Sequence, residues 1–333
     1  MVEIDPAELL RTAGRYRLSQ AIYVAALLGV ADHLAEGDKS AEELAAAASL
    51  HAGLLRRLMR ALASEGIFRE SDDGRFAMGP AGKLLVSGSG TREMILGWSV
   101  FPATWAAFGN LAESIRVGRP AFELAHGLGF HEYLARNPAA ARAYDDAMAT
   151  TVDAFDGAAA SYDFSKMRTV VDVGGGGGGF LVALLMRYPE TIGINFDRPE
   201  VISNIDTSRI PTVARNRFKL VGGDFFKDEL PEGDAFVLCT VLRLFEDDRA
   251  VELLGKVRDA MHPHGKVLAL DFVHPAGPLV APYGLADLHA MAVYGGRDRS
   301  EAEFGQLFAA AGLRLTRVIE TGDIHSWVEG LPR

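Results

Sequence analysis

The 333-residue sequence has a single cysteine, no long uninterrupted apolar run and no dense run of lysine or arginine. Cys239 cannot form an internal disulfide, and secreted proteins of this size usually carry several cysteines, so we expect a cytoplasmic protein. The most apolar early stretch, residues 21–31, leads into Asp32 and His33 and continues amphipathically. That pattern favours a buried helix over a signal peptide or a membrane segment.

The balance of charge is acidic, with 34 Lys and Arg against 44 Asp and Glu and a formal net charge of −10. No basic run could neutralise a row of phosphates, so nucleic acid is not expected as a partner. The nine histidines show no metal-ligand spacing supported by cysteine or by paired acids. We therefore expect no metal site.

The N-terminal region, residues 1–90, is predicted to be a small, mainly helical domain. Residues 6–84 are rich in Ala and Leu, and residues 66–78 (GIFRESDDGRFAM) are typical of a hairpin around Asp72–Gly74. Helices followed by a hairpin form a winged-helix unit. Only Arg56, Arg57 and Arg60 could make a basic recognition helix, so dimerisation is favoured over DNA binding.

The middle region, residues 91–164, is also predicted to be helical. Its aromatic residues Trp98, Phe101, Trp105 and Phe108 recur at intervals of three and four. They are interpreted either as a helix packing face or as part of the wall of an aromatic substrate pocket. In the second interpretation the wall also includes Phe130, Tyr144, Met148 and Phe155.

The C-terminal region, residues 165–333, alternates strand-length apolar runs with helix-length segments, which predicts an α/β domain with a parallel sheet. Strands are expected at 169–173, 191–197, 218–222, 235–240 and 266–272, followed by an antiparallel pair at 313–319 and 325–329.

The first of these strands opens into six glycines, in VVDVGGGGGGF at 170–180, before a predicted helix. Glycine there allows a tight turn and lets a ligand approach the main chain and the helix N-terminus. Gly174, Gly176 and Gly179 satisfy G-x-G-x-x-G, a pattern shared by proteins that bind NAD, FAD and S-adenosylmethionine (SAM). Asp197, 21 residues after Gly176, could accept hydrogen bonds from ribose hydroxyls of any of them.

The later strands end in further polar groups. GGDFF at 222–226 places Asp224 and Phe225 where a carboxylate could accept from an adenine amino group and a ring could stack on the base. The next strands end at Cys239 with Thr240 and at Asp271. Ligands of open α/β sheets bind outside the carboxyl ends of the strands, so these residues predict one nucleotide-binding rim.

With YRLSQAIYVAALLGVADHLAEG, INFDRP, GGRDRSEAEF and IHSWVEG, these motifs make nearly the whole chain resemble the SAM-dependent small-molecule O-methyltransferases of secondary metabolism. The resemblance implies a class I Rossmann-like domain behind a winged-helix dimerisation domain, SAM as cofactor, and a homodimer. It also implies a cofactor site that holds the methionine part at the glycine loop, the ribose at Asp197 and the adenine at Asp224 and Phe225. The implied site residues are Gly174, Gly175, Gly176, Gly178, Asp197, Arg198, Gly223, Asp224, Phe225 and Cys239.

The sequence departs from that family at the catalytic base. Relatives carry a His-Asp-Trp run after the fourth strand, whereas this chain has VLRLFEDDRA with Arg243 at the histidine's position. The two acids that flank that histidine in relatives match Asp271 and Asp298. His289 lies between them in the sequence and is a candidate substitute base, with a half-buried helix residue as the alternative. His126 and His131 have a weaker claim through a pocket-lining segment.

An arginine cannot take a proton, but it can hold an anionic oxygen with two parallel hydrogen bonds. Arg243 is therefore expected to bind the acceptor. The alternative is a salt bridge to Asp247 or Asp248.

The leading hypothesis for function is O- or C-methylation of a small aromatic or polyketide-like metabolite. The second is a repurposed relative that binds SAM but catalyses hydroxylation, decarboxylation, elimination or rearrangement. A SAM-sensing or DNA-binding regulator and a nicotinamide dehydrogenase are less favoured.

Overall fold

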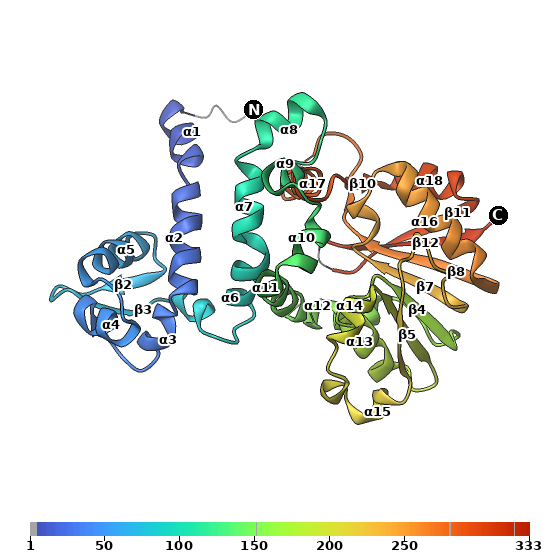
Figure 1. Cartoon of the computed structure of the whole chain (residues 1–333), viewed down its shortest axis with the longest axis horizontal. Coiled ribbons are helices and arrows are strands. Elements are labelled where there is room, and N and C mark those ends of the chain that lie inside the picture. Colours follow the sequence, from blue (N-terminus) through green and yellow to red (C-terminus); the bar gives the residue numbers. More distant parts are fainter. Residues whose placement is uncertain (1–4, 151, 280, 323) are drawn as a thin grey trace. The chain divides into compact units, whose positions relative to one another are not determined.

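The computed structural model describes residues 5–150, 152–279, 281–322 and 324–333 (Figure 1). These residues form two compact units. The first contains the chain up to Trp105 together with Asn137–Thr150, and the second contains Ala106–Arg136 together with the chain from residue 152 onward.

The first unit is helical apart from three short strands. Strands β2 (Phe68–Glu70) and β3 (Arg75–Met78) form the expected hairpin, and β1 (Lys39–Ser40) pairs antiparallel with β3. The helices are α1 (Pro6–Ala13), α2 (Tyr16–Leu27), α3 (Val30–Leu34), α4 (Ala41–Ala48), α5 (Ala52–Ser64), η1 (Gly82–Leu85), α6 (Thr91–Met94), η2 (Ile95–Ser99) and α11 (Pro138–Ala149), and α7 (Pro102–Phe108) begins in this unit. The winged-helix prediction is thereby confirmed in its helices and hairpin.

Local sequence explains how these helices begin and which faces they bury. Ser40 caps α4, because its hydroxyl accepts from the Glu43 amide at 3.2 Å while the Glu43 carboxylate accepts from the Ser40 amide at 2.7 Å. The shared core contains Leu44, Met59 and Phe76. The sides of α1 and α2 that face away from this core expose large apolar side chains, including Leu9, Leu10, Tyr16 and Leu27, which are 55% to 73% exposed. An apolar surface of this kind is typical of an interface.

The second unit contains one seven-stranded sheet in the order β11-β12-β8-β7-β4-β5-β6 (Figure 1). Its parallel strands are β4 (Thr169–Val173), β5 (Ile192–Asp197), β6 (Phe218–Gly222), β7 (Gly233–Cys239) and β8 (Met261–Asp271), and β11 (Leu313–Glu320) and β12 (Ser326–Pro332) form the terminal antiparallel pair. The strand order reverses at β4, since β5 lies on one side of it and β7 on the other. Such a switch point is where open α/β sheets bind ligands.

Helices cover both faces of this sheet, as its alternating side chains require. Val171 and Phe236 face the core made with α16 (Asp247–Asp259) and α18 (Glu301–Ala310), whereas Val170 and Val237 face α12 (Val152–Ser161) and α13 (Gly179–Arg187). The remaining elements are α8 (Leu111–Val117), α9 (Ala121–His126), α10 (Phe130–Arg136), α14 (Pro199–Ser203), η3 (Thr207–Arg209), α15 (Thr212–Arg215), η4 (Leu242–Leu244), α17 (Tyr283–His289), η5 (Ala290–Tyr294) and the short parallel pair β9 (Val273–His274) and β10 (Arg299–Ser300). The predicted α/β fold class is confirmed.

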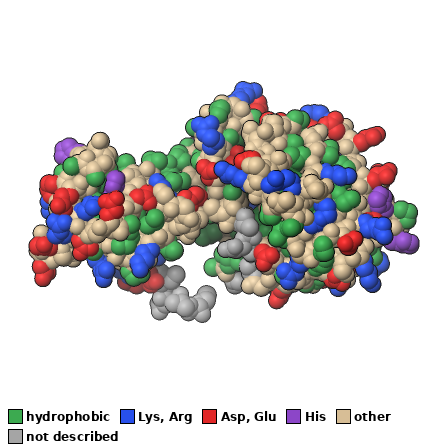
Figure 2. Space-filling model, turned by 90° about the horizontal axis from the view of Figure 1, so that it is seen from below, with side chains coloured by type: hydrophobic (Ala, Val, Ile, Leu, Met, Phe, Trp, Pro, Cys, Tyr) green, Lys and Arg blue, Asp and Glu red, His purple; other side chains and the backbone are tan. Residues whose placement is uncertain are grey.

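Two surface properties agree with the composition. Among the described residues no helix combines the length and the apolarity that crossing a bilayer requires. On the face seen in Figure 2, basic and acidic side chains are interspersed and form no continuous basic patch.

Candidate active site

The glycine loop after β4 is a tight turn that leaves main chain accessible. Gly174, Gly176 and Gly178 have φ of +74°, +53° and +78°, a region that favours glycine. A Cβ on Gly175 would lie 2.2 Å from Oδ1 of Asn195, whereas a Cβ on Gly176 would meet nothing within 4 Å. The loop is therefore packed against the sheet on one side and has space for a ligand on the other.

Two buried polar side chains lie beneath this loop. Both carboxylate oxygens of Asp172 and Oδ1 of Asn195 make no hydrogen bond with any described residue, although Asn195 Nδ2 donates to the Gly176 carbonyl at 2.9 Å. Burial, together with the charge of Asp197, raises the pKa of Asp172 to about 8. Neither residue was identified from the sequence, although an acid in a strand buried on both faces was a usable signal.

Asp197 ends β5 and is tied to the glycine loop. Its Oδ2 accepts from the Gly176 amide at 2.8 Å and its Oδ1 accepts from the Arg198 amide at 2.7 Å. Burial raises its pKa, while these two backbone donors act in the opposite direction. The Arg198 side chain pairs with Glu200 at 3.2 Å. Each carboxylate oxygen keeps a second lone pair for another donor.

The end of β6 brings an acid and an aromatic ring to the same edge. Phe225 Cε1 lies 3.7 Å from the position of a Cβ on Gly174, so this ring adjoins the glycine loop. Half-buried Asp224 accepts from Lys227 Nζ at 2.8 Å, and this bond holds its pKa below the usual range. The preceding Gly223 is buried, and a Cβ there would lie 2.6 Å from the Phe196 ring.

Cys239 ends β7 on the same rim. Desolvation of its half-buried side chain raises its pKa well above the ordinary value, and the charges of Asp172 and Asp271 act in the same direction. The thiol therefore stays protonated at neutral pH and is a small polar group here, not a nucleophile.

Arg243, on the turn η4 that follows β7, forms a buried ion pair with Asp298. Its Nε and Nη2 donate to the two carboxylate oxygens of Asp298 at 2.7 and 3.0 Å, and Nη2 also donates to the Ala286 carbonyl at 3.0 Å. The guanidinium carbon lies 4.2 Å from the centre of the Phe272 ring. The alternative of a salt bridge to Asp247 or Asp248 is wrong, because the guanidinium points to Asp298 instead.

Asp271 is the second acid of this cluster and is held by backbone. Its Oδ2 accepts from the Arg243 amide at 3.2 Å and its Oδ1 from the Phe272 amide at 3.1 Å. Burial raises its pKa to about 7, although the charge of Arg243 lowers it, and Asp298 raises it further. Asp271 thus changes protonation near neutral pH while Asp298 is committed to the ion pair.

Several rings gather near this cluster within the second unit. His289 lies one turn after Ala286 and has ring-centre distances of 5.7 Å to Tyr294 and 6.1 Å to Phe108. His131 lies 6.1 Å from Tyr294 with its ring at 22°. Burial lowers the pKa of each histidine to about 4, with the charges of Arg243 on His289 and Arg198 on His131 acting in the same direction.

The other aromatic residues of the middle region have different surroundings. Phe101 is buried, and Trp105 lies 6.3 Å from Tyr16 in the first unit, whereas Phe108 adjoins His289. His126 packs on Phe122 at 4.4 Å. The helix face of 98–108 is therefore divided between packing and the ring cluster. Among the described residues no group of three or more His, Cys, Asp or Glu could hold a metal ion.

Comparisons with known proteins agree with this arrangement. Residues 108–314 match the model of an O-methyltransferase domain, and residues 10–88 match an O-methyltransferase dimerisation domain. The chain is 36% identical over 327 residues to phenazine O-methyltransferase PhzM of Lysobacter antibioticus, which covers 97% of this chain and 95% of that protein. It is also 36% identical to the 2,7-dihydroxy-5-methyl-1-naphthoate 7-O-methyltransferase of Streptomyces carzinostaticus, with 92% of each chain covered.

Solved structures extend the likeness to three dimensions. The crystal structure of LaPhzM superposes with a TM-score of 0.92 at 36% identity, over 98% of this chain and 99% of that one. The O-methyltransferase NcsB1 from neocarzinostatin biosynthesis, solved with SAM and 2-hydroxy-5-methyl naphthoic acid, superposes with a TM-score of 0.87 at 33% identity, and both chains are covered completely.

Proposed function

The chain belongs to the O-methyltransferase family and is a SAM-dependent methyltransferase, and on that premise we propose that its acceptor is a small aromatic metabolite with an anionic oxygen at the reacting end. The observation that carries this proposal is the buried pair of Arg243 with Asp298, at the position where the family resemblance implies a basic histidine. A polyketide-like aromatic acid fits this description.

SAM is the cofactor, and the residues present fit it. The glycine loop leaves main chain open at Gly176. The oxygens of Asp172 beneath it accept from no donor within the part of the chain that the structure describes, as suits a site for a cation. We assign the methionine part to residues 174–178, the ribose to Asp197 and the adenine to Asp224 and Phe225. When bound, SAM supplies an electrophilic methyl group on its sulfonium.

The protein is a homodimer, in agreement with the match of residues 10–88 to a dimerisation domain. Exposed apolar side chains on α1 and α2, such as Leu10 at 73% exposure, are candidates for burial in that interface.

An aromatic acceptor is supported by the ring cluster of Phe108, His131, His289 and Tyr294, since flat rings stack or pack edge-on against flat substrates. The names of the relatives are consistent with it, because they act on phenazines and naphthoates. We assign these four side chains to the wall of the acceptor pocket.

The anionic character of the acceptor follows from the chemistry of the arginine. A guanidinium remains charged and cannot accept the proton of a phenol. Asp298 occupies Nε and Nη2, and none of the hydrogen bonds that Arg243 makes with described residues uses Nη1. We assign Nη1 to an acceptor phenolate, enolate or carboxylate. A protonated acceptor would need another base, and Asp271, with a pKa of about 7, is better suited than His289, with a pKa of about 4.

The arginine at position 243 also favours one other function, a non-methylating reaction of a repurposed relative. A reaction that needs no base at this position is compatible with Arg243. Product formation without SAM consumption would support that function instead.

The test is an acceptor screen built on matched pairs, such as 2-hydroxy-1-naphthoate with 2-naphthol, followed by mass spectrometry and measurement of S-adenosylhomocysteine. We expect methylation of the carboxylated member, a preference of about tenfold or more over its partner, and loss of that preference in Arg243→Gln. The control is Arg116→Gln, which alters an exposed pair with Glu113 on α8. Equal rates for both members of every pair would contradict the anionic acceptor.

A further inference from the structure

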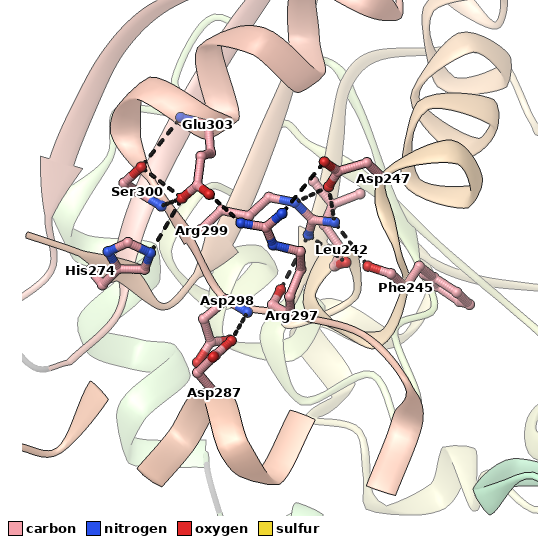
Figure 3. A network of polar contacts seen from close by, with 10 residues as sticks. All are labelled: Leu242, Phe245, Asp247, His274, Asp287, Arg297, Asp298, Arg299, Ser300 and Glu303. Atoms are coloured by element: carbon pink, nitrogen blue, oxygen red, sulfur yellow. Dashed lines mark hydrogen bonds and ion pairs between the residues drawn. The ribbon is translucent and has the colours of Figure 1, made fainter. Parts of the chain in front are cut away.

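Arg299, on β10, is a buried arginine whose five N–H groups all have acceptors (Figure 3). Nε and Nη2 donate to Oδ1 of Asp247 at 2.9 and 2.7 Å. Nη1 donates to the carbonyls of Leu242 and Arg297 at 3.0 and 3.3 Å, and Nη2 donates to the Phe245 carbonyl at 2.8 Å. Only 1% of the residue is exposed, so it meets neither solvent nor the rim directly.

The acceptors of Arg299 bracket the turn that carries Arg243. Leu242 begins η4, and Phe245 follows its last residue. The Leu242 carbonyl accepts from the Phe245 amide at 3.3 Å, and the planar guanidinium adds a second donor to it and also binds the Phe245 carbonyl, so Arg299 holds both ends of the turn. The backbone of the segment that carries Arg299, residues 296–299, also packs against η4. A Cβ on Gly296 would lie 2.2 Å from the Arg243 carbonyl oxygen.

Asp298, which directly precedes Arg299, holds the side chain of Arg243 on η4. Asp298 binds the Arg243 guanidinium while Arg299 binds the backbone on either side of it. The segment is in turn anchored, because β10 pairs with β9 through Arg299 and Val273. Ser300 also donates to Glu303, whose carboxylate lies 3.3 Å from His274 (Figure 3). Arg299 thus fixes the position of the η4 backbone, and Asp298 fixes the orientation of the Arg243 side chain.

We propose that Arg299 is a positioning residue for methyl transfer, which holds η4 where Arg243 can meet the acceptor. The proposal rests on the proposed function, because that function assigns Arg243 to the acceptor. Arg299 acts through Arg243 and touches neither substrate nor cofactor. A lysine would keep the charge but could not span Leu242, Phe245 and Asp247 with a planar fork, so Arg299→Lys tests geometry with the charge retained.

Arg217 offers a matched control. Its guanidinium also binds backbone carbonyls, at 2.7 to 3.1 Å, which are those of Leu185, Tyr188, Thr191 and Val213. Arg217 directly precedes β6, at the amino end of that strand, whereas the rim lies at the carboxyl ends. Arg217→Lys therefore shows what happens when a guanidinium that binds backbone carbonyls is lost elsewhere in the second unit, away from η4.

The first measurement needs no acceptor. In Arg299→Lys, amide hydrogen exchange within residues 242–246 should accelerate by about tenfold or more relative to the rest of the second unit, and Arg217→Lys should leave that segment unchanged. The dissociation constant of SAM should stay within about threefold of wild type in both variants. Unchanged exchange at 242–246 in Arg299→Lys would overturn the proposal.

The second measurement uses the most active hydroxy acid of the screen. Turnover per folded Arg299→Lys enzyme should fall roughly 10- to 100-fold with little change in acceptor KM, whereas Arg217→Lys should turn over at the wild-type rate. In an Arg243→Gln background the same substitution should change turnover less than about twofold, because the positioned group is gone. An equal loss in both backgrounds would overturn the positioning role. Wild-type turnover in Arg243→Gln alone would instead refute the assignment of Arg243 under the proposed function.

Discussion

Replacing Arg243 by glutamine removes the cation from a buried cluster while keeping a polar side chain of similar reach. The wild-type residue is 5% exposed and neutralises Asp298, which is 3% exposed. Without the guanidinium, Asp298 becomes an unpaired buried charge beside Asp271. Breaking one side of a buried pair commonly costs about 3–5 kcal/mol of unfolding free energy, so Arg243→Gln should be clearly less stable than wild type.

The effect on turnover has a separate origin. Loss of one preorganised donor to a developing or resident oxyanion commonly costs about 2.7–4 kcal/mol of activation free energy, which corresponds to roughly a 100- to 1000-fold lower kcat. The pH profile should also move. The charge of Arg243 lowers the pKa of Asp271, so its removal raises that pKa above about 7. If Asp271 accepts a proton, the acidic limb of kcat/KM moves to higher pH.

The double variant Arg243→Gln/Asp298→Asn separates the two effects. It removes the unpaired charge of Asp298, and Asp271 is mostly protonated at neutral pH because its pKa rises without Arg243, so most of the lost thermal stability should return. Turnover stays low because the cationic donor is still absent. The assay is turnover of the native-like acceptor with S-adenosylhomocysteine release, beside thermal unfolding and SAM affinity, which should change by no more than a few fold. Near wild-type turnover in the double variant would refute an acceptor role and reduce Arg243 to a structural ion pair.

Three further outcomes are expected. Asp197→Ala should weaken SAM binding by about 1.5–3 kcal/mol in calorimetry, through loss of charge-assisted hydrogen bonds, and unchanged affinity would disprove the ribose assignment. Gly175→Ala should impair SAM binding, because its Cβ would lie 2.2 Å from Asn195 Oδ1. Gly255→Ala, on α16 and outside the glycine loop, meets nothing within 4 Å and should bind SAM normally; equal affinities of the two variants would contradict the loop geometry. Burial would raise the pKa of Glu329, but hydrogen bonds, of which that from Arg317 is the strongest, lower it to about 2. The ionised Glu329 therefore stabilises the folded protein fully above about pH 4.5, and this contribution is lost as the pH falls toward 2. Glu329→Gln should therefore be less stable than wild type by on the order of 2 kcal/mol at pH 7, with a gap that closes in acid unfolding curves; a gap independent of pH would contradict this account.

Part of the candidate site was predictable because it depends on main-chain geometry and strand ends. A run of glycines between a strand and a helix restricts the backbone to a few conformations, and parallel strands deliver their last residues to one edge. Gly174, Asp197, Phe225 and Asp271 were identified for that reason, and the structure places them at or just after the carboxyl ends of β4, β5, β6 and β8.

What the sequence by itself determined, then, is the α/β class, which strand ends carry glycine, acidic and aromatic residues, and that an arginine stands at position 243. Only the tertiary structure decided what Arg243 contacts, since Asp298 is 55 residues away and Asp247 was nearer along the chain. The same holds for Asp172, whose buried carboxylate has no donor among the described residues. It holds also for Arg299, whose acceptors other than the Arg297 carbonyl lie 52 to 57 residues earlier. The direction of a buried side chain depends on packing among distant segments and on which charges lose their water together, and no local periodicity contains that information.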